Sequence, residues 1–149
     1  DKIELILQKW TEIWYDKYYF FNSKRSQKLI ISENKFERLQ KIAIEACEQS
    51  GRNIIPEIVF LDKLDINSLK NDKNIYFHTD GNIKTSLKDL SIENEKNINI
   101  FVWPEWGFDE SEINNFSENN FTACTLWENI LRCETAAIVS GFAVKNFCL

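Results

Sequence analysis

The chain has 149 residues, of which 44% are hydrophobic and 13% aromatic, so it is long enough for one globular domain and too short for two comfortable ones. Its formal net charge of -5 and pI near 5.0 do not attract nucleic acid, so any contact with RNA or DNA must come from local basic groups. No apolar run approaches the roughly 20 residues of a membrane span, and no targeting leader opens the chain. We therefore expect a single domain over residues 1–149, located in the cytoplasm and without membrane contact.

The cysteines and the single histidine do not form a metal-binding pattern. Cys47, Cys124, Cys133 and Cys148 lie far apart without a CxxC pair, and His78 cannot complete a Cys/His zinc site alone. The cysteines are predicted to be reduced, mostly buried thiols, as is usual in the cytosol, and no metal site is expected.

The first part of the chain predicts two helices and two strands. Apolar residues recur at three-four spacing from Lys2 to Trp14, which indicates one helix. The aromatic run from Tyr18 to Phe21 suits a buried strand. A second helix is expected between Asn34, a candidate cap, and Gly51, just past its end, and the chain from Pro56 to Phe60 looks extended.

Three more strands are predicted after residue 70. Residues 74–78 read as a strand that runs into a turn over residues 79–82, where an Asp-Gly pair supplies the positive φ. Residues 97–103 alternate and then become continuously apolar, which is typical of a central parallel strand, and residues 121–126 form another. Strands that alternate with helices predict an α/β fold with a mainly parallel sheet flanked by helices.

Two helices are predicted between and after these strands. Asp109 is expected to cap the first, with Glu112 as its capping-box partner. The second, from Glu134 to Phe147, is apolar nearly all round and must be buried on more than one side. A subunit interface and deep packing within the monomer explain this second helix equally well.

Three loops follow the strands, and ligands of open α/β sheets bind beyond the carboxyl ends of the strands. The loops are residues 78–82, 103–109 and 127–134. No GxGxxG or P-loop pattern follows any strand, so an ordinary dinucleotide or nucleoside-triphosphate site is not expected. His78 has no nucleophile motif nearby, which favours a structural or pocket-lining role over a catalytic base.

The string "LWENILRCETAA", residues 126–137, places Arg132 where a loop enters a helix. Backbone N–H groups also point outward at a helix start, so such a corner suits an anionic group. Alternatively, Arg132 pairs with Glu134 or Glu105, and the string alone does not decide between these interpretations.

This string and four others, in order along the chain, resemble the RsmE family, which methylates N3 of a uridine in bacterial 16S ribosomal RNA. The family typically shows a GPEGG-like loop, an LGxxILRxETA string and a QSxRxxxP segment. The matching stretches here are "QKWTEIWYDKY" (8–18), "SKRS" (23–26), "EACEQSGRNIIPEI" (45–58), "FVWPEWGFDESEI" (101–113) and "LWENILRCETAA" (126–137). The resemblance spans nearly the whole chain.

The resemblance implies a SPOUT-type methyltransferase domain, an α/β fold whose C-terminal part forms a trefoil knot. Such a domain binds S-adenosylmethionine (SAM) in the knot loops and forms a homodimer, which agrees with the apolar last helix. Its partner would be 16S rRNA or the small ribosomal subunit. The family also carries an N-terminal PUA-like RNA-binding barrel, which we expect to be absent from this chain; its absence would explain both the missing methionine and the acidic balance.

The resemblance also implies roles for particular residues. Arg132 is the catalytic candidate, because a cation near N3 would favour loss of its proton, and Arg25 and Arg52 are candidate RNA contacts. Cofactor contacts would come mostly from the backbone of residues 102–107 and 126–131, with apolar side chains as pocket walls. The cofactor-binding candidates are Phe77, Val102, Trp103, Pro104, Glu105, Trp106, Gly107, Leu126, Trp127, Ile130 and Leu131.

All five tryptophans fall where the family has glycine or another small residue: Trp10, Trp14, Trp103, Trp106 and Trp127. Glycine in a cofactor loop permits positive φ and close approach of the backbone, so three indoles there should fill the pocket. One hypothesis is that UGA codons for glycine have been read as tryptophan, so that the native protein has glycine at all five positions. Two alternatives remain: Trp10 and Trp14 belong to the apolar stripe of their helix, or the chain is a non-catalytic dimeric RNA-binding or ribosome-assembly module without cofactor.

Overall fold

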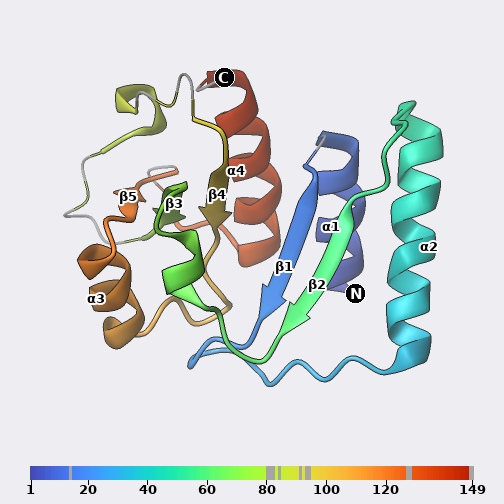
Figure 1. The fold of residues 1–149 in the computed structure, drawn as a ribbon, viewed down its shortest axis with the longest axis horizontal. Helices are drawn as coiled ribbons and strands as arrows, with labels where there is room; N and C mark the ends of the chain where they lie inside the picture. The colour runs from blue at the N-terminus through green and yellow to red at the C-terminus, as the bar shows by residue number, and fades with distance from the viewer. Residues whose placement is uncertain are drawn as a thin grey trace. The chain divides into compact units, whose positions relative to one another are not determined.

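The structure is a computed structural model that describes residues 1–13, 15–79, 83, 85–90, 92, 95–126 and 129–147. The chain divides into two compact units. The first unit comprises Asp1–Asn22 and Gln27–Lys63, and the second comprises Ser23–Ser26 and Leu64–Leu149. In chain order (Figure 1) the helices and strands are α1 (Lys2–Ile13), β1 (Lys17–Phe21), α2 (Glu33–Ser50), β2 (Glu57–Leu61), η1 (Ile66–Leu69), β3 (Lys73–Phe77), η2 (Leu87–Asp89), β4 (Ile98–Phe101), α3 (Glu110–Glu118), β5 (Thr122–Cys124) and α4 (Cys133–Phe147).

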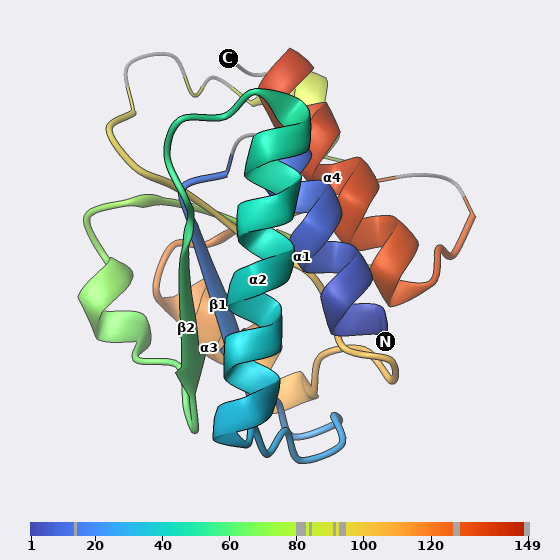
Figure 2. The same ribbon diagram turned by 90° about the vertical axis from the view of Figure 1, so that its right-hand side faces the viewer.

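The first unit is a two-stranded parallel sheet covered by two helices. β1 and β2 pair in register, with Tyr19 opposite Val59. α1 and α2 lie side by side against this sheet (Figures 1 and 2). The core contains at least one residue from α1, from α2 and from β1. Partly buried aromatic and apolar residues, some of them from β1 and β2, pack around this core. The fully buried members are Leu7, Tyr18, Leu39 and Ala43. The predicted helices and strands of this part of the chain are confirmed.

The ends of α2 show where the sequence prediction was right and where it was wrong. Gly51 follows the helix with φ of 72°, a left-handed conformation that glycine adopts without strain, and its N–H bonds to the carbonyl of Cys47. The cap at the other end is Ser32 and not Asn34, because the Ser32 hydroxyl accepts the backbone N–H of Lys35. The earlier cap places Glu33 in the first turn, where its negative charge favours the helix dipole.

The second unit contains a three-stranded parallel sheet in the order β4-β3-β5. β3 is therefore the central strand of this sheet. Residues 97–103 were predicted to form a central strand, but β4 lies at the edge of the described sheet, so that prediction was wrong. The reason is that the apolar run continues past Phe101, where β4 ends, into Val102 and Trp103 of the following loop. Five aromatic rings pack between the sheet and α3 with neighbouring centroids 5.1–6.4 Å apart: Tyr76, Phe101, Phe108, Phe116 and Phe121.

Of the two α-helices of this unit, α3 begins where the sequence predicts, and α4 begins one residue earlier than predicted, at Cys133. Asp109 caps α3 in a full capping box with Glu112. The buried face of α4 consists mostly of small residues. Val139 and Phe142, on another face of the helix, are 36% and 54% exposed. The expectation that α4 is buried on more than one side is therefore not met within this chain. The buried residues of α4 are Ala136, Ala137, Ser140, Gly141, Ala143 and Val144.

These features confirm an α/β fold with parallel sheets flanked by helices. The trefoil knot and the single-domain boundary at 1–149 stay predictions. Cys47 and Cys124 are buried as predicted, Cys133 is half-buried, and Cys148 lies outside the described residues. Within the described part of the chain, no helix is both long and apolar enough to cross a membrane, and no three His, Cys, Asp or Glu side chains gather as metal ligands.

Candidate active site

A small pocket lies at the carboxyl ends of the three strands of the second unit. Because β3, β4 and β5 are parallel, the loops that follow them meet at one edge of the sheet. The ladder continues past the strands, since the N–H of His78 donates to the carbonyl of Cys124 at 3.1 Å. The described lining residues come from all three loops: His78, Thr79, Trp103, Leu126, Asn129, Ile130 and Leu131. Four of them, Trp103, Leu126, Ile130 and Leu131, are sequence-predicted cofactor residues.

The Trp103 side chain is buried in the wall of this pocket. This side chain is only 8% exposed, and the cavity that remains beside it measures about 30 Å³. A cavity of that size holds about one water molecule. Trp106, three residues on, is 73% exposed and does not line the cavity. Of the three tryptophans predicted to fill the cofactor pocket, Trp103 is therefore the one placed in it, while Trp127 lies outside the described residues.

The backbone of the loop tolerates tryptophan without the strain that the glycine pattern suggests. Among the described residues other than glycine, Asn120 alone has positive φ, so Trp103 and Trp106 have ordinary backbone conformations. The positive φ of the loop falls on Gly107, at 75°, whose N–H closes a turn onto the carbonyl of Pro104 at 2.9 Å. The cost of Trp103 is therefore the space that its indole occupies and not backbone strain.

The other predicted cofactor residues lie around this turn or under the pocket. Phe77 is fully buried in the core beneath it. Val102, Pro104 and Gly107 are partly buried, and Glu105 is exposed. None of these five is among the described lining residues, and their roles in cofactor binding stay predictions.

Arg132 immediately precedes α4, as predicted from the sequence. Its carbonyl accepts the N–H of Ala136 at 2.8 Å, which begins the helix, and its side chain is exposed. Ile130 and Leu131, its neighbours in the chain, line the pocket. Arg132 is therefore next in the chain to the pocket wall, and its guanidinium is accessible to an anionic group from solvent. Its catalytic role stays a prediction.

Arg25 lies on a turn that packs against the start of α3. The Ser26 N–H donates to the Ser23 carbonyl at 3.1 Å, which closes the turn. The Nε of Arg25 lies 3.9 Å from Asp109 Oδ2, and the Nζ of Lys24 lies 3.6 Å from Oδ1 of the same carboxylate. Both basic side chains are more than half exposed. Arg25 thus remains available to an RNA phosphate.

Arg52 has a different environment in the first unit. Its side chain is 1% exposed, its Nη1 donates to the carbonyl of Thr11 at 3.3 Å, and its Nη2 lies 3.1 Å from Asp16 Oδ1. This geometry favours a structural role in which Arg52 ties α2 to the end of α1. Contact with RNA stays a prediction for Arg52 and would require these bonds to open.

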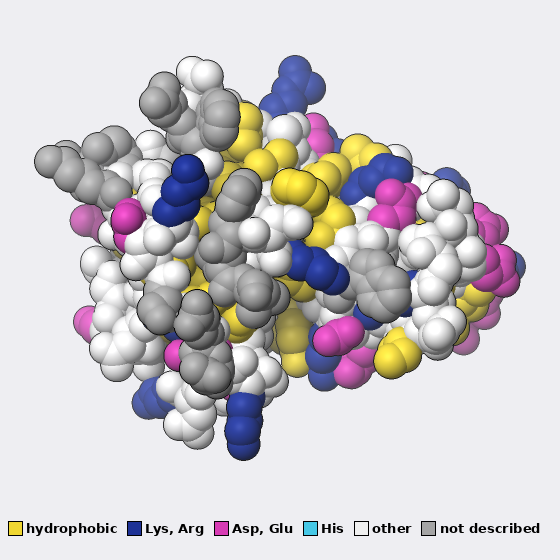
Figure 3. Space-filling view, turned by 90° about the horizontal axis from the view of Figure 1, so that it is seen from above, with side chains coloured by type: hydrophobic (Ala, Val, Ile, Leu, Met, Phe, Trp, Pro, Cys, Tyr) yellow, Lys and Arg dark blue, Asp and Glu magenta, His cyan; other side chains and the backbone are white. Residues whose placement is uncertain are grey.

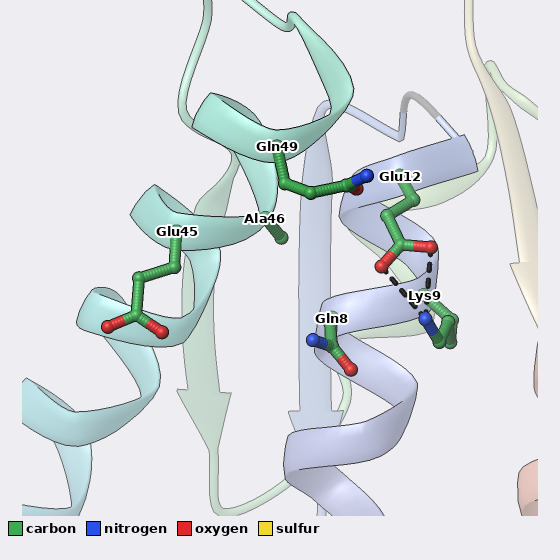
Figure 4. A pocket seen from close by; sticks show the side chains of 6 residues that line it. All are labelled: Gln8, Lys9, Glu12, Glu45, Ala46 and Gln49. Atoms are coloured by element: carbon green, nitrogen blue, oxygen red, sulfur yellow. Dashed lines mark hydrogen bonds and ion pairs between the residues drawn. The ribbon is translucent and has the colours of Figure 1, made fainter.

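A second hollow lies in the first unit between α1 and α2, and sequence reasoning did not single it out. It measures about 410 Å³, and Lys9 and Glu12 form an ion pair of 2.9 Å on its wall (Figure 4). Its walls are mostly charged or amide side chains: Gln8, Lys9, Glu12, Glu45, Ala46 and Gln49. It therefore lacks the apolar lining that most small-molecule sites have. Sequence reasoning also missed Thr79 and Asn129 in the first pocket, although their loops were predicted.

Comparison with known proteins gives the family. The RNA methyltransferase domain family matches residues 1–145. The ribosomal RNA small subunit methyltransferase E of Buchnera aphidicola is 35% identical over 98% of this chain and 59% of its own length, and that of Mesomycoplasma hyopneumoniae is 36% identical over 91% and 60%. A crystal structure of the Neisseria gonorrhoeae methyltransferase E bound to S-adenosyl methionine superposes with a TM-score of 0.79 at 32% identity, over 99% of this chain and 62% of that chain.

These matches cover nearly all of this chain, which spans about 60% of the length of the curated relatives it matches. They agree with the order of the motifs along the sequence and with the parallel α/β architecture. The resemblance seen in the sequence is therefore confirmed: the chain belongs to the RNA methyltransferase domain family and is of the RsmE type.

Proposed function

We propose that this chain is the catalytic domain of an enzyme that transfers a methyl group from SAM to N3 of a uridine in 16S ribosomal RNA. The observation that carries the proposal is the pocket at the carboxyl ends of β3, β4 and β5, lined by the loops that hold the RsmE-type motifs. The named relatives are rRNA small subunit methyltransferases, and one was solved with the cofactor. The cytoplasm, where ribosomes are, is the compartment that this substrate implies.

The pocket as it stands does not fit SAM. Pockets for molecules of this size measure about 300–1,000 Å³, against about 30 Å³ beside Trp103. Of the two tryptophans of this loop, Trp103 is the one whose removal would enlarge the pocket, because Trp103 is buried there whereas Trp106 is exposed. The proposal therefore includes glycine at position 103 in the active protein, as the codon hypothesis states. Peptide mass spectrometry of residues 101–113 from the native source reads the residue directly, and tryptophan there would contradict that hypothesis.

Arg132 is our candidate for the group that assists the substrate. N3 of uracil must lose a proton before it accepts a methyl group, and a nearby cation stabilises the anion that results. Arg132 is exposed and follows directly after Ile130 and Leu131, which line the pocket. The chain supplies positioning and charge, and no metal is needed for either.

The same proposal covers the assembly. Val139 and Phe142 leave an apolar strip of α4 exposed, which supports a homodimer in which a second copy covers it. The PUA-like domain would belong to the part of the relatives that this chain does not span. The non-catalytic RNA-binding or assembly module is not favoured, because the relatives cited are methyltransferases.

The experiment that tests the function is transfer of an isotope-labelled methyl group from SAM to purified small ribosomal subunits. The chain is assayed as it stands and as Trp103→Gly, and the modified nucleoside is identified by mass spectrometry. We expect label on a uridine N3 with Trp103→Gly and little or none with Trp103. Label on another base, or none with either form, would contradict the proposal.

A further inference from the structure

The turn Ser23–Ser26 is held in one conformation by its own hydrogen bonds. Ser26 Oγ accepts the N–H of Ser23 at 3.1 Å and donates to the Ser23 carbonyl at 2.9 Å, in addition to the closing backbone bond. Lys24 and Arg25 occupy the two central positions, with side chains 64% and 52% exposed. The turn therefore presents two adjacent cations on a rigid backbone.

Glu112 fastens this turn to α3. Its Oε2 accepts the hydroxyl of Ser23 at 3.1 Å, and its Oε1 accepts the backbone N–H of Lys24 at 3.2 Å. The same carboxylate accepts the N–H of Asp109 at 2.7 Å as part of the capping box. Three donors thus converge on one carboxylate, and hydrogen bonds to an ionised acceptor are about twice as strong as neutral ones.

Asp109 lies near the charged groups of both Lys24 and Arg25 and leaves these side chains exposed to solvent. Lys24 Nζ and Arg25 Nε lie 3.6 Å and 3.9 Å from its two oxygens, and Lys24 Nζ also donates to the exposed Ser111 hydroxyl. Exposed ion pairs of this kind contribute little to stability. A phosphate can therefore replace Asp109 as the partner at small cost, and the side chains are already gathered when it arrives.

The place of the turn connects it to the candidate site. Asp109 ends the loop that begins after β4, and Trp103 of that loop lines the pocket. The whole-chain charge of -5 repels RNA, so local cations must supply the attraction. On the face drawn in Figure 3, the Lys and Arg side chains that are visible are interspersed with Asp and Glu and form no broad basic field.

From this geometry we infer that Glu112 is a positioning residue for RNA: it holds Lys24 and Arg25 as a phosphate clamp at the outer end of the active-site loop. The inference rests on the proposed RNA substrate. It adds Lys24 to the RNA contacts and gives Glu112 a role beyond capping α3. Because the clamp does not depend on the pocket, it operates whether or not position 103 admits the cofactor.

The test compares Glu112→Gln with Glu110→Gln in binding a short, fluorescently labelled uridine-rich RNA to the full chain. Each change removes one negative charge from the first turn of α3, so a general electrostatic effect would tighten binding equally. In Glu112→Gln the amide offers one acceptor oxygen to three donors, so the turn is released even though glutamine still serves in a capping box. We expect Glu112→Gln to bind several-fold more weakly than the unaltered chain and Glu110→Gln to bind at least as tightly.

Two further variants separate positioning from folding and identify the phosphate contacts. Ser23→Ala removes one bond to Glu112 and leaves the capping box intact, so it should weaken RNA binding while the chain stays folded. Lys24→Ala with Arg25→Ala should lower the slope of log affinity against log salt by about 0.7 for each phosphate that is no longer neutralised. If Glu112→Gln binds RNA as tightly as Glu110→Gln, or if the double variant keeps the full salt slope, the clamp is overturned.

The failure of the clamp and the failure of the proposed function give different results. If RNA binds all variants equally and the Trp103→Gly form retains methyl transfer, only the clamp is overturned. Phosphate contacts are strong at about 50 mM salt. If the unaltered chain binds no RNA even under that condition, both the clamp and the proposal that RNA is the substrate are overturned.

Discussion

Ser23 and Glu112 are 89 positions apart in the chain and are joined by a hydrogen bond of 3.1 Å. This bond places a short turn from the early part of the chain within the second unit, beside the cap of α3. As a consequence, Lys24, Arg25 and the loop that begins with Val102 are part of one structure. The geometry of the candidate site therefore depends on residues that lie far from its motifs in sequence.

The charge of Asp109 should make the second unit sensitive to acid. Hydrogen bonds from Ser111, together with the attraction of Lys24, hold the pKa of Asp109 below its ordinary value of 3.8. A lowered pKa in the folded state means that the ionised carboxylate stabilises the fold above pH 3.8 and that this contribution is lost as pH falls through the lowered pKa. Asp109→Asn keeps a good cap but has no charge to lose.

The measurement is thermal unfolding of both forms at decreasing pH. We expect the unaltered chain to melt above Asp109→Asn near neutral pH and the two to converge in acid. A gap that stays constant down to the lowest pH would contradict the assignment of this stabilisation to the Asp109 charge.

Tyr18 should make the first unit sensitive to alkali. Burial raises the pKa of Tyr18 to about 12, and bonds to Thr11 and the charge of Arg52 oppose that shift only partly. The unfolded phenol ionises near 10.0, so the folded state holds this proton more tightly. Stability is therefore fully present below pH 10 and falls, by up to about 1.4 kcal/mol per pH unit, as pH rises from 10 towards 12.

Tyr18→Phe keeps the ring and removes the ionisable group, so it should lack this part of the alkaline loss. Urea unfolding at several pH values between 9 and 12 measures the difference. Identical alkaline profiles for the two forms would show that Tyr18 is not buried as the structure has it.

Much of the fold could be predicted because the relevant signals are local. The three-four spacing of α1, the aromatic run of β1 and the Asp109–Glu112 spacing each specify an element from adjacent residues. The cap of α2 was missed because Ser32 and Asn34 are both good caps, and only the bond to the Lys35 N–H chooses between them. The end of β4 was missed because burial continues into Trp103, so apolar character did not mark it.

The site was predictable in outline and not in its details. Parallel strands require their following loops to meet, so the loops around the pocket followed from order in the chain, whereas the resemblance to the RsmE family supplied Leu126, Ile130 and Leu131 as its walls. Trp103 is buried and Trp106 is exposed because their side chains point in different directions after β4, and no sequence pattern specifies these directions. The Ser23–Glu112 bond depends on tertiary packing across most of the chain.

The core of the first unit gives a direct test of the packing. Leu39 is fully buried between α2 and the sheet, so Leu39→Ala should lower the free energy of unfolding by about 2–5 kcal/mol, whereas Ile44→Ala on the same helix removes a side chain that is 39% exposed and should cost much less. Urea denaturation followed by circular dichroism compares the two. Equal losses would contradict the placement of the α2 apolar face.

Replacement of Arg132 tests the chemistry without disturbing the fold. Its side chain is exposed, so Arg132→Ala should leave the melting temperature unchanged while methyl transfer in the Trp103→Gly form is lost. Arg132→Lys keeps a cation but not the guanidinium geometry, and it should restore part of the rate. Unchanged turnover in Arg132→Ala would remove this residue from the mechanism.

The central claim is that the pocket between β3, β4 and β5 is the SAM site and that the Trp103 indole closes it. Calorimetric titration of SAM into the unaltered chain, Trp103→Gly and Trp106→Gly tests this claim most directly, because the two variants remove the same side chain from a buried and from an exposed position of one loop. We predict binding to Trp103→Gly and none to the other two forms. Binding to the unaltered chain or to Trp106→Gly, or no binding to a folded Trp103→Gly, would contradict the account.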